Sequence, residues 1–295
     1  MSHIEVDGLA LNVERAGDGP PVVMLHGFTG AAAGWGSLAQ LLAPEFTTLA
    51  VDIVGHGASD APAGLERYAM ARCVDDLAAL LQELGYERVC WLGYSMGGRV
   101  ALQVAVRRPE VVSALVLEGA TPGLIDAGER ALRVAADEAL AERIEAEGVE
   151  AFVEEWEALP LFASQAALPA GTREAVRAGR LANRAVGLAN SLRGAGAGAQ
   201  EPLHDRLNGV GVPALLLAGA LDEKFTEIGR GLARALPDAT MQLIEDAGHA
   251  AHIERPDAFG EAVLAFLRRV HAATAQTPDG VTADRAGGGY SGRTL

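Results

Sequence analysis

The sequence predicts an α/β protein with a mostly parallel central sheet, helices on both faces, and a helical cap inserted after the sixth strand. Short, fully apolar runs alternate with amphipathic helical runs along most of the chain. This alternation is typical of parallel strands that are joined by right-handed crossover helices. Between residues 121 and 205 the strand pattern stops and only helical patterns remain. A serine on a sharp turn between a strand and a helix is the third observation.

The elements follow in order along the chain. An edge hairpin is expected over residues 3–16, because Asp7-Gly8 separates two alternating runs. Further strands are expected at 21–25, 46–52, 88–92, 112–117, 214–218 and 240–244. Helices are expected at 35–42, 68–84, 99–105, 225–236 and 257–270, and in the insertion at 129–147, 149–158, 172–182 and 186–192.

This pattern divides the chain into a core, a cap and a tail. The core is expected over 1–120 and 206–271, and the helical cap over 121–205. Residues 272–295 are polar, rich in glycine and without hydrophobic periodicity, so we expect a disordered tail.

Composition excludes several classes of function. The net charge of −15 argues against a nucleic-acid partner, because phosphate backbones are bound by basic surfaces. The two cysteines, Cys73 and Cys90, lie in apolar stretches and are interpreted as buried thiols in a reducing compartment. The sequence shows neither a secretory signal nor an apolar run long enough to cross a membrane. We therefore expect a cytoplasmic protein without a membrane partner; the oligomeric state stays open.

Gly93-Tyr94-Ser95-Met96-Gly97 is the strongest local signal. It stands between the apolar run 89–92 and a helical run that begins near Arg99. This context predicts a nucleophile elbow, in which a strained turn exposes the hydroxyl of Ser95 at the start of a helix. An ordinary serine in a tight turn is the simpler alternative.

A nucleophilic or basic serine needs a histidine and a carboxylate, which on this architecture follow it in the order acid, then histidine. Asp222 follows the run 214–218 and His249 follows the run 240–244, so they are the predicted partners of Ser95. His252 competes for the histidine role, and Glu118 and Asp52 compete for the acid role. His56 and Asp60 are expected to fix a glycine-rich loop.

The backbone N–H groups of Met96 and Phe28 are the predicted oxyanion hole. Met96 follows the serine, and Phe28 lies in the loop after the first central strand. His249 and His252 are three residues apart, but no third ligand pattern accompanies them, so we predict no metal site.

These motifs together resemble the α/β-hydrolase superfamily over residues 20–270. Six longer matches carry a narrower resemblance, and they extend into the cap, where unrelated hydrolases diverge. They are Leu25-His26-Gly27-Phe28-Thr29-Gly30, Ser95-Met96-Gly97-Gly98-Arg99, the run 117–124, the run 160–165, the run 187–194, and Asp222-Glu223-Lys224-Phe225. In these stretches the chain is similar to the 2-succinyl-6-hydroxy-2,4-cyclohexadiene-1-carboxylate synthases.

The resemblance implies a lyase of menaquinone biosynthesis that needs no cofactor. The family's substrate is a small polycarboxylate, a cyclohexene with a ring carboxylate, a succinyl group and an enolpyruvyl ether. The triad would remove a ring proton, pyruvate would leave, and a conjugated diene would remain. The serine is then interpreted as a base rather than as an acyl carrier.

Carboxylates are recognised by the planar fork of arginine, and in so acidic a chain such arginines must be local to the pocket. Arg99 begins the helix behind Ser95, while Arg133 and Arg180 correspond by spacing to the family's substrate-binding arginines. Tyr94 and Trp156 are expected to line the pocket. Arg193 and Lys224 are further candidates for ligands. For each arginine the alternative is a solvated or ion-paired helix residue.

Two other functions remain open. A carboxylesterase or C–C bond hydrolase would use the same triad without the arginines. A non-catalytic binding protein would not need Ser95 at all.

Overall fold

The fold is described from a computed structural model over residues 2–276. One sheet has the strand order β1-β2-β4-β3-β5-β6-β7-β8. β1 pairs antiparallel with β2, β2 pairs antiparallel with β4, and β3 to β8 run parallel to one another. The strands are β1 (Ser2–Val6), β2 (Leu9–Ala16), β3 (Pro21–Leu25), β4 (Thr47–Val51), β5 (Val89–Tyr94), β6 (Val112–Glu118), β7 (Ala214–Gly219) and β8 (Ala239–Ile244). The mostly parallel sheet predicted from the sequence is confirmed.

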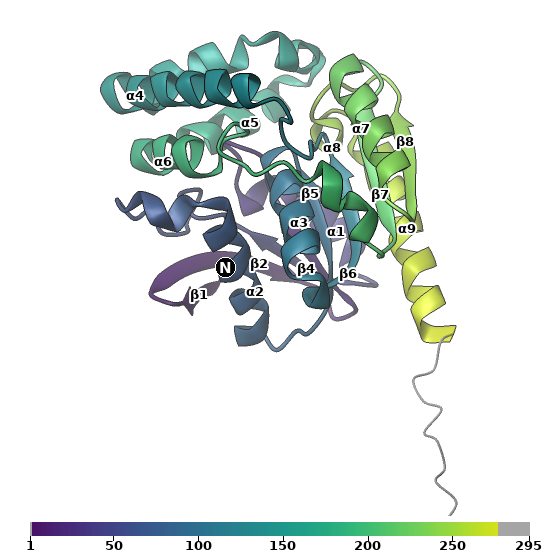
Figure 1. Cartoon of the computed structure of the whole chain (residues 1–295). Helices are drawn as coiled ribbons and strands as arrows, with labels where there is room; N and C mark the ends of the chain where they lie inside the picture. Colours follow the sequence, from purple (N-terminus) through teal and green to yellow (C-terminus); the bar gives the residue numbers. More distant parts are fainter. Residues whose placement is uncertain (1, 277–295) are drawn as a thin grey trace, which may run out of the picture.

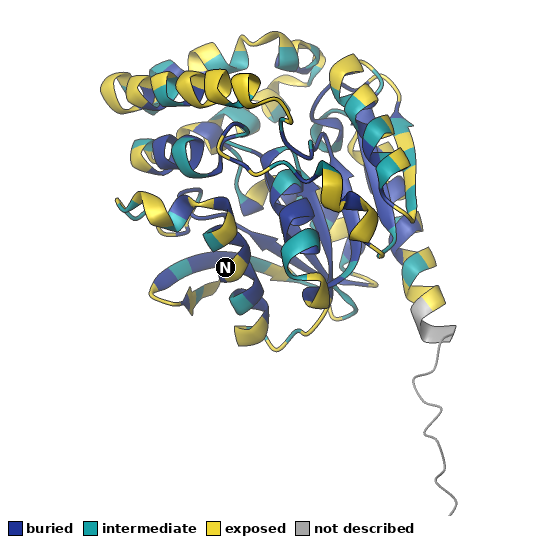
Figure 2. Cartoon of the chain, in the orientation of Figure 1, coloured by how far each residue is buried: buried dark blue, intermediate teal, exposed yellow. Residues whose placement is uncertain are grey.

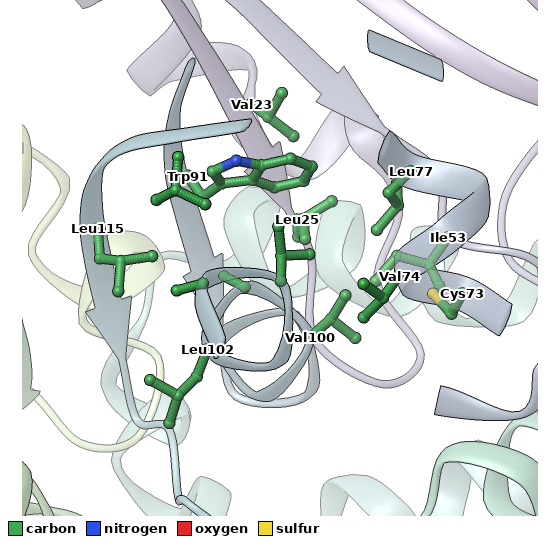
Figure 3. Close-up of a cluster of buried hydrophobic side chains, with 14 of the residues drawn as sticks. Val23, Leu25, Ile53, Cys73, Val74, Leu77, Trp91, Val100, Leu102 and Leu115 are labelled. Atoms are coloured by element: carbon green, nitrogen blue, oxygen red, sulfur yellow. The ribbon is translucent and has the colours of Figure 1, made fainter. Parts of the chain in front are cut away.

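Alternate residues of the central strands fill two separate cores, because successive side chains of a strand point to opposite faces. Val23 and Leu25 pack against helices α2 (Met70–Glu83) and α3 (Met96–Arg107) around the fully buried Trp91, as Figure 3 shows. Val22 and Met24 belong to the other core. Helices α1 (Gly36–Leu42) and α9 (Pro256–Gln276) cover that second face, and α7 (Glu223–Ala235) contributes to the first.

A helical cap lies between β6 and β7, as predicted. It holds α4 (Ala127–Glu157), α5 (Ala170–Leu181) and α6 (Ala185–Ala195), which lie together at the top of Figure 1. Gly148, with a φ of 86°, kinks α4 at the break expected between its two halves. The cap has a small core of its own, centred on Phe152, Leu188 and Leu192, while the outer surface of α4 is exposed (Figure 2).

Short helices complete the chain. They are η1 (Ala32–Trp35), η2 (Leu65–Tyr68), η3 (Pro109–Val111), η4 (Pro160–Ala167), η5 (His204–Gly209) and α8 (Ala251–Glu254). The sequence did not predict η4, whose Phe162 and Gln165 become important at the site.

The predicted start of the tail is wrong by five residues, because α9 continues to Gln276. The rest of the predicted tail lies outside the described residues. Within residues 2–276, no helix combines the length and the apolar composition that crossing a bilayer requires.

Candidate active site

Ser95 occupies a strained turn at the junction of β5 and α3. Its φ of 51° and ψ of −106° lie outside the regions that a residue with a side chain ordinarily adopts. The turn is tight: a Cβ atom at Gly97 would lie 2.1 Å from the carbonyl oxygen of Leu25, and one at Gly93 would lie 2.3 Å from that of Gly97. Only glycine allows this approach, which explains both glycines of the motif.

Three loops at the carboxyl ends of β5, β7 and β8 bring Ser95, Asp222 and His249 together. The Oγ atom of Ser95 lies 3.1 Å from Nε2 of His249, and Nδ1 of His249 lies 2.7 Å from Oδ2 of Asp222. Both partners of the serine are buried. The arrangement allows His249 to take the serine proton while Asp222 stabilises the resulting imidazolium.

Two neighbours hold the partners of Ser95 in place. The other carboxylate oxygen of Asp222 accepts a hydrogen bond of 3.1 Å from the backbone of Phe225, so Asp222 also caps α7. Gly119, with a φ of 57°, faces the His249 ring, and a Cβ atom there would lie 2.8 Å from that ring. A side chain at position 119 would therefore displace the imidazole.

The competing residues have other partners. Glu118 contacts His252 rather than His249, with 2.7 Å between Oε2 and Nδ1. Asp52 accepts hydrogen bonds from the backbone of Ala32 and Ala58. Asp52 and Glu118 were only alternatives for the acid, and within residues 2–276 it is Asp222 that pairs with His249.

The glycine-rich loop is fixed by the residues expected to fix it. Asp60 accepts a 2.8 Å hydrogen bond from the backbone of Ala10. His56 is completely buried against His26, and this burial lowers its pKa to about 3. Among the described residues, no group of three His, Cys, Asp or Glu side chains is arranged to hold a metal ion.

A cavity of about 290 Å³ lies over Ser95 and His249. Phe28 and Met96 line it, and Met96 is the first residue of α3, so its N–H group has no acceptor within the helix. Tyr94 and Trp156 also line the cavity. Met96 and Phe28 both border the cavity over Ser95, and their N–H groups stay the predicted oxyanion hole.

Arg99 and Arg133 supply positive charge to this cavity. Arg99 donates hydrogen bonds to the carbonyl oxygen of Ala195 (2.8 Å) and to Oε1 of Gln200 (2.9 Å). Burial and the charge of Arg133 lower the pKa of Arg99 to about 10, which leaves it protonated at neutral pH. Arg133 is half-exposed and pairs with Asp137, whose pKa is raised by burial.

Arg180 does not line the cavity over Ser95. It lies at an adjoining cavity of about 580 Å³, which shares Phe28, Tyr94 and Phe162 with the first. Its guanidinium lies 5.1 Å from the centre of the Phe162 ring and donates to Glu157 (3.0 Å) and to Gln165 (3.1 Å). Phe162 therefore borders both the serine cavity and Arg180.

The two further candidate cations are placed away from the serine cavity. Arg193 forms ion pairs with Glu138 and Glu145 of α4, which is the structural alternative considered for it. Lys224 lies over the ring of Phe225, and it lines neither of the two cavities.

Sequence reasoning missed Gln200, Phe162 and Gln165 as individual residues. Gln200 orients Arg99, while Phe162 and Gln165 hold Arg180. Phe162 and Gln165 belong to the matched run 160–165, so the signal was present. Gln200 lies in no matched run.

This fold and this arrangement of Ser95, His249 and Asp222 define the class. A family model of the alpha/beta hydrolase fold matches residues 20–256, and the expected α/β-hydrolase fold is confirmed.

Relatives place the chain more narrowly. It is 45% identical over 249 residues to a Bacillus subtilis (strain 168) protein provisionally named 2-succinyl-6-hydroxy-2,4-cyclohexadiene-1-carboxylate synthase, covering 84% of this chain and 90% of that protein. It is 35% identical to the Serratia proteamaculans (strain 568) synthase of that name, covering 88% and 98%. The chain belongs to the family of 2-succinyl-6-hydroxy-2,4-cyclohexadiene-1-carboxylate synthases.

Solved structures give the same fold. The structure of MenH from S. aureus has a TM-score of 0.84 and 31% identity, covering 92% of this chain and 100% of that one. A malate-bound thermophilic esterase from Thermogutta terrifontis has a TM-score of 0.83 and 27% identity, with the same coverage. The fold is thus shared by a lyase family and by hydrolases, and it cannot separate them alone.

Proposed function

We propose that this protein eliminates pyruvate from 2-succinyl-5-enolpyruvyl-6-hydroxy-3-cyclohexene-1-carboxylate, giving 2-succinyl-6-hydroxy-2,4-cyclohexadiene-1-carboxylate in menaquinone biosynthesis. The family to which the chain belongs supports the reaction. The observation that carries the proposal for this chain is the arrangement of Ser95, His249 and Asp222. They lie within hydrogen-bonding distance of one another, beneath a cavity that two arginines line. The lack of a span-length helix in residues 2–276 is compatible with a cytoplasmic enzyme.

Ser95 acts as the base in this proposal. His249 Nε2 takes the hydroxyl proton as Ser95 Oγ takes a proton from the substrate ring, and Asp222 stabilises the imidazolium. The ring C–H electrons form the C2=C3 double bond, the electrons of the existing C3=C4 double bond move to C4=C5, and the C–O bond at C5 breaks. The leaving enolpyruvate takes up the proton that the His249 imidazolium returns and becomes pyruvate. The N–H groups of Phe28 and Met96 stabilise the negative charge that develops on the substrate.

Substrate binding is assigned to Arg99 and Arg133 in the serine cavity and to Arg180 beside it. Each arginine can form charge-assisted hydrogen bonds to a carboxylate. Tyr94 and Trp156 provide apolar walls for the ring. Arg180 would bind a substrate carboxylate that extends past Phe162 into the adjoining cavity.

Replacement of the triad tests the assignment. If the three residues act as a unit, Ser95→Ala should lower kcat for pyruvate release by about 10⁴-fold or more, and Ser95→Ala/His249→Ala should lower it little further. Additive losses, or a Ser95→Ala enzyme of full activity, would contradict the triad. The second outcome would instead point to a different base.

The alternative is a carboxylesterase or C–C bond hydrolase with the same three residues. The similarity to the esterase fold supports it, because a serine activated in this way can also be acylated. Turnover of a neutral nitrophenyl ester separates the two reactions, since such an ester has no carboxylate for the arginines to bind.

A further inference from the structure

A second carboxylate–histidine pair lies directly behind the triad. Glu118 is the last residue of β6 and is completely buried, and the His252 side chain is 8% exposed. Oε2 of Glu118 lies 2.7 Å from Nδ1 of His252, and its Oε1 accepts a 3.1 Å hydrogen bond from the backbone N–H of His252. One carboxylate thus holds both the ring and the backbone of the same residue.

The pair is joined to both halves of the reacting centre. The backbone carbonyl of Glu118 accepts a 2.7 Å hydrogen bond from the backbone N–H of Ser95. His252 lies three residues after His249, at the start of the short helix α8. Glu118 therefore links the strained turn of the serine to the segment that carries the histidine, across two strand ends.

The pair also contacts the triad through a stack of aromatic rings. The ring of Tyr94 lies 4.6 Å from the ring of His252 and 5.3 Å from that of His249, between centroids. On its other side His252 packs against Trp35 at 4.6 Å. A shift of His252 would thus be transmitted to His249 through the backbone and through Tyr94.

The two facing atoms of the pair have no hydrogen-bond partner within residues 2–276. Nδ1 of His252 and Oε2 of Glu118 lie 2.7 Å apart, at ion-pair distance, so separating them removes the close polar contact of two buried atoms. Glu118 lines neither cavity, and His252 lines only the adjoining cavity that also contains Arg180. The pair therefore does not touch a group bound in the cavity over Ser95.

We propose that Glu118 and His252 form a positioning pair that keeps Nε2 of His249 within hydrogen-bonding distance of Ser95. This inference rests on the proposed triad, and it assigns a function to Glu118 and His252, which are not members of the triad. Small errors in such geometry are costly, since a displacement of about 1 Å can lower a rate by roughly 100-fold.

The reactivity of Ser95 toward a fluorophosphonate measures this geometry without the substrate. Glu118→Gln keeps the side-chain shape but only one oxygen, and His252→Phe keeps the ring packing and the backbone hydrogen bond but removes Nδ1. Each variant should label roughly 10- to 100-fold more slowly than the wild type, with kcat lowered and KM for the enolpyruvyl substrate unchanged. Because the two residues act together, the double variant should label little more slowly than either single variant.

Asp76→Asn is the matched control. Asp76 is also a buried carboxylate, paired with Arg67 and Arg72 on the α2 side of the core, and it does not line the serine cavity. It should lower the melting temperature without slowing the labelling of Ser95. If Glu118→Gln and His252→Phe also lower only the melting temperature and label at the wild-type rate, the pair is structural and the proposal is wrong. A Ser95→Ala enzyme that still releases pyruvate would overturn the triad itself, whatever the labelling rates of the Glu118 and His252 variants.

Discussion

Arg99 offers the most specific test of how the cavity recognises a carboxylate. Within residues 2–276 its guanidinium uses Nη1 for two hydrogen bonds, to Ala195 and Gln200, which leaves its other N–H donors available to a ligand. It borders the cavity over Ser95 and carries its charge at neutral pH. A carboxylate bound there gains charge-assisted hydrogen bonds.

Such bonds contribute about 1.5–3 kcal/mol, so Arg99→Ala should lower kcat/KM for the enolpyruvyl substrate roughly 10- to 100-fold. Arg99→Lys should recover only part of this loss, because a point charge does not replace a planar fork. Pyruvate release, followed with a coupled dehydrogenase, gives kcat/KM. Hydrolysis of a neutral nitrophenyl ester by the same variants should change little.

Arg193→Ala is the control, because Arg193 is ion-paired to two glutamates outside the serine cavity. It should leave kcat/KM near the wild-type value. The reasoning is refuted if Arg99→Ala keeps full activity on the enolpyruvyl substrate, or if it loses ester hydrolysis to the same extent, because either result would make Arg99 a structural residue.

Two further predictions concern the fold around the site. Gly97→Ala should destabilise the protein by about 3 kcal/mol or more, because the new Cβ atom would overlap the Leu25 carbonyl. Urea unfolding measures this loss of stability. A loss below about 1 kcal/mol would show that the turn can relax. His56 has a folded-state pKa of about 3, below its ordinary value, so it stabilises the fold fully above pH 6.5 and loses this contribution as the pH falls toward 3. The free energy of unfolding should fall by a few kcal/mol between pH 7 and 4, and a His56→Gln variant with an equally steep fall would contradict the assignment.

The triad could be predicted from sequence because each member follows its strand directly. Ser95, Asp222 and His249 lie within a few residues of the ends of β5, β7 and β8, and parallel strands bring those ends to one edge of the sheet. Local motif and strand order are therefore enough. The role of Gly93 and Gly97 in the tight turn could also be predicted, because both belong to the local strand–turn–helix motif around Ser95.

The partners of the arginines could not be predicted in this way. Arg193 and Arg180 both lie in helices of the cap. Only the packing of these helices determines that Arg193 pairs with glutamates and that Arg180 borders a cavity. Arg180 lies behind Phe162 of η4, a helix that the hydrophobic pattern did not reveal. The contact of Glu118 with His252 likewise depends on the fold, because the two residues are far apart in sequence.

The central claim is that this cavity and triad carry out an elimination rather than a hydrolysis. The direct measurement supplies the wild-type enzyme with the enolpyruvyl substrate and follows pyruvate and the conjugated diene together, with a neutral nitrophenyl ester measured in parallel. We expect pyruvate and diene in equal amounts, and kcat/KM far above that for the ester. Fast ester turnover without pyruvate release from the enolpyruvyl substrate would contradict the account and identify a hydrolase.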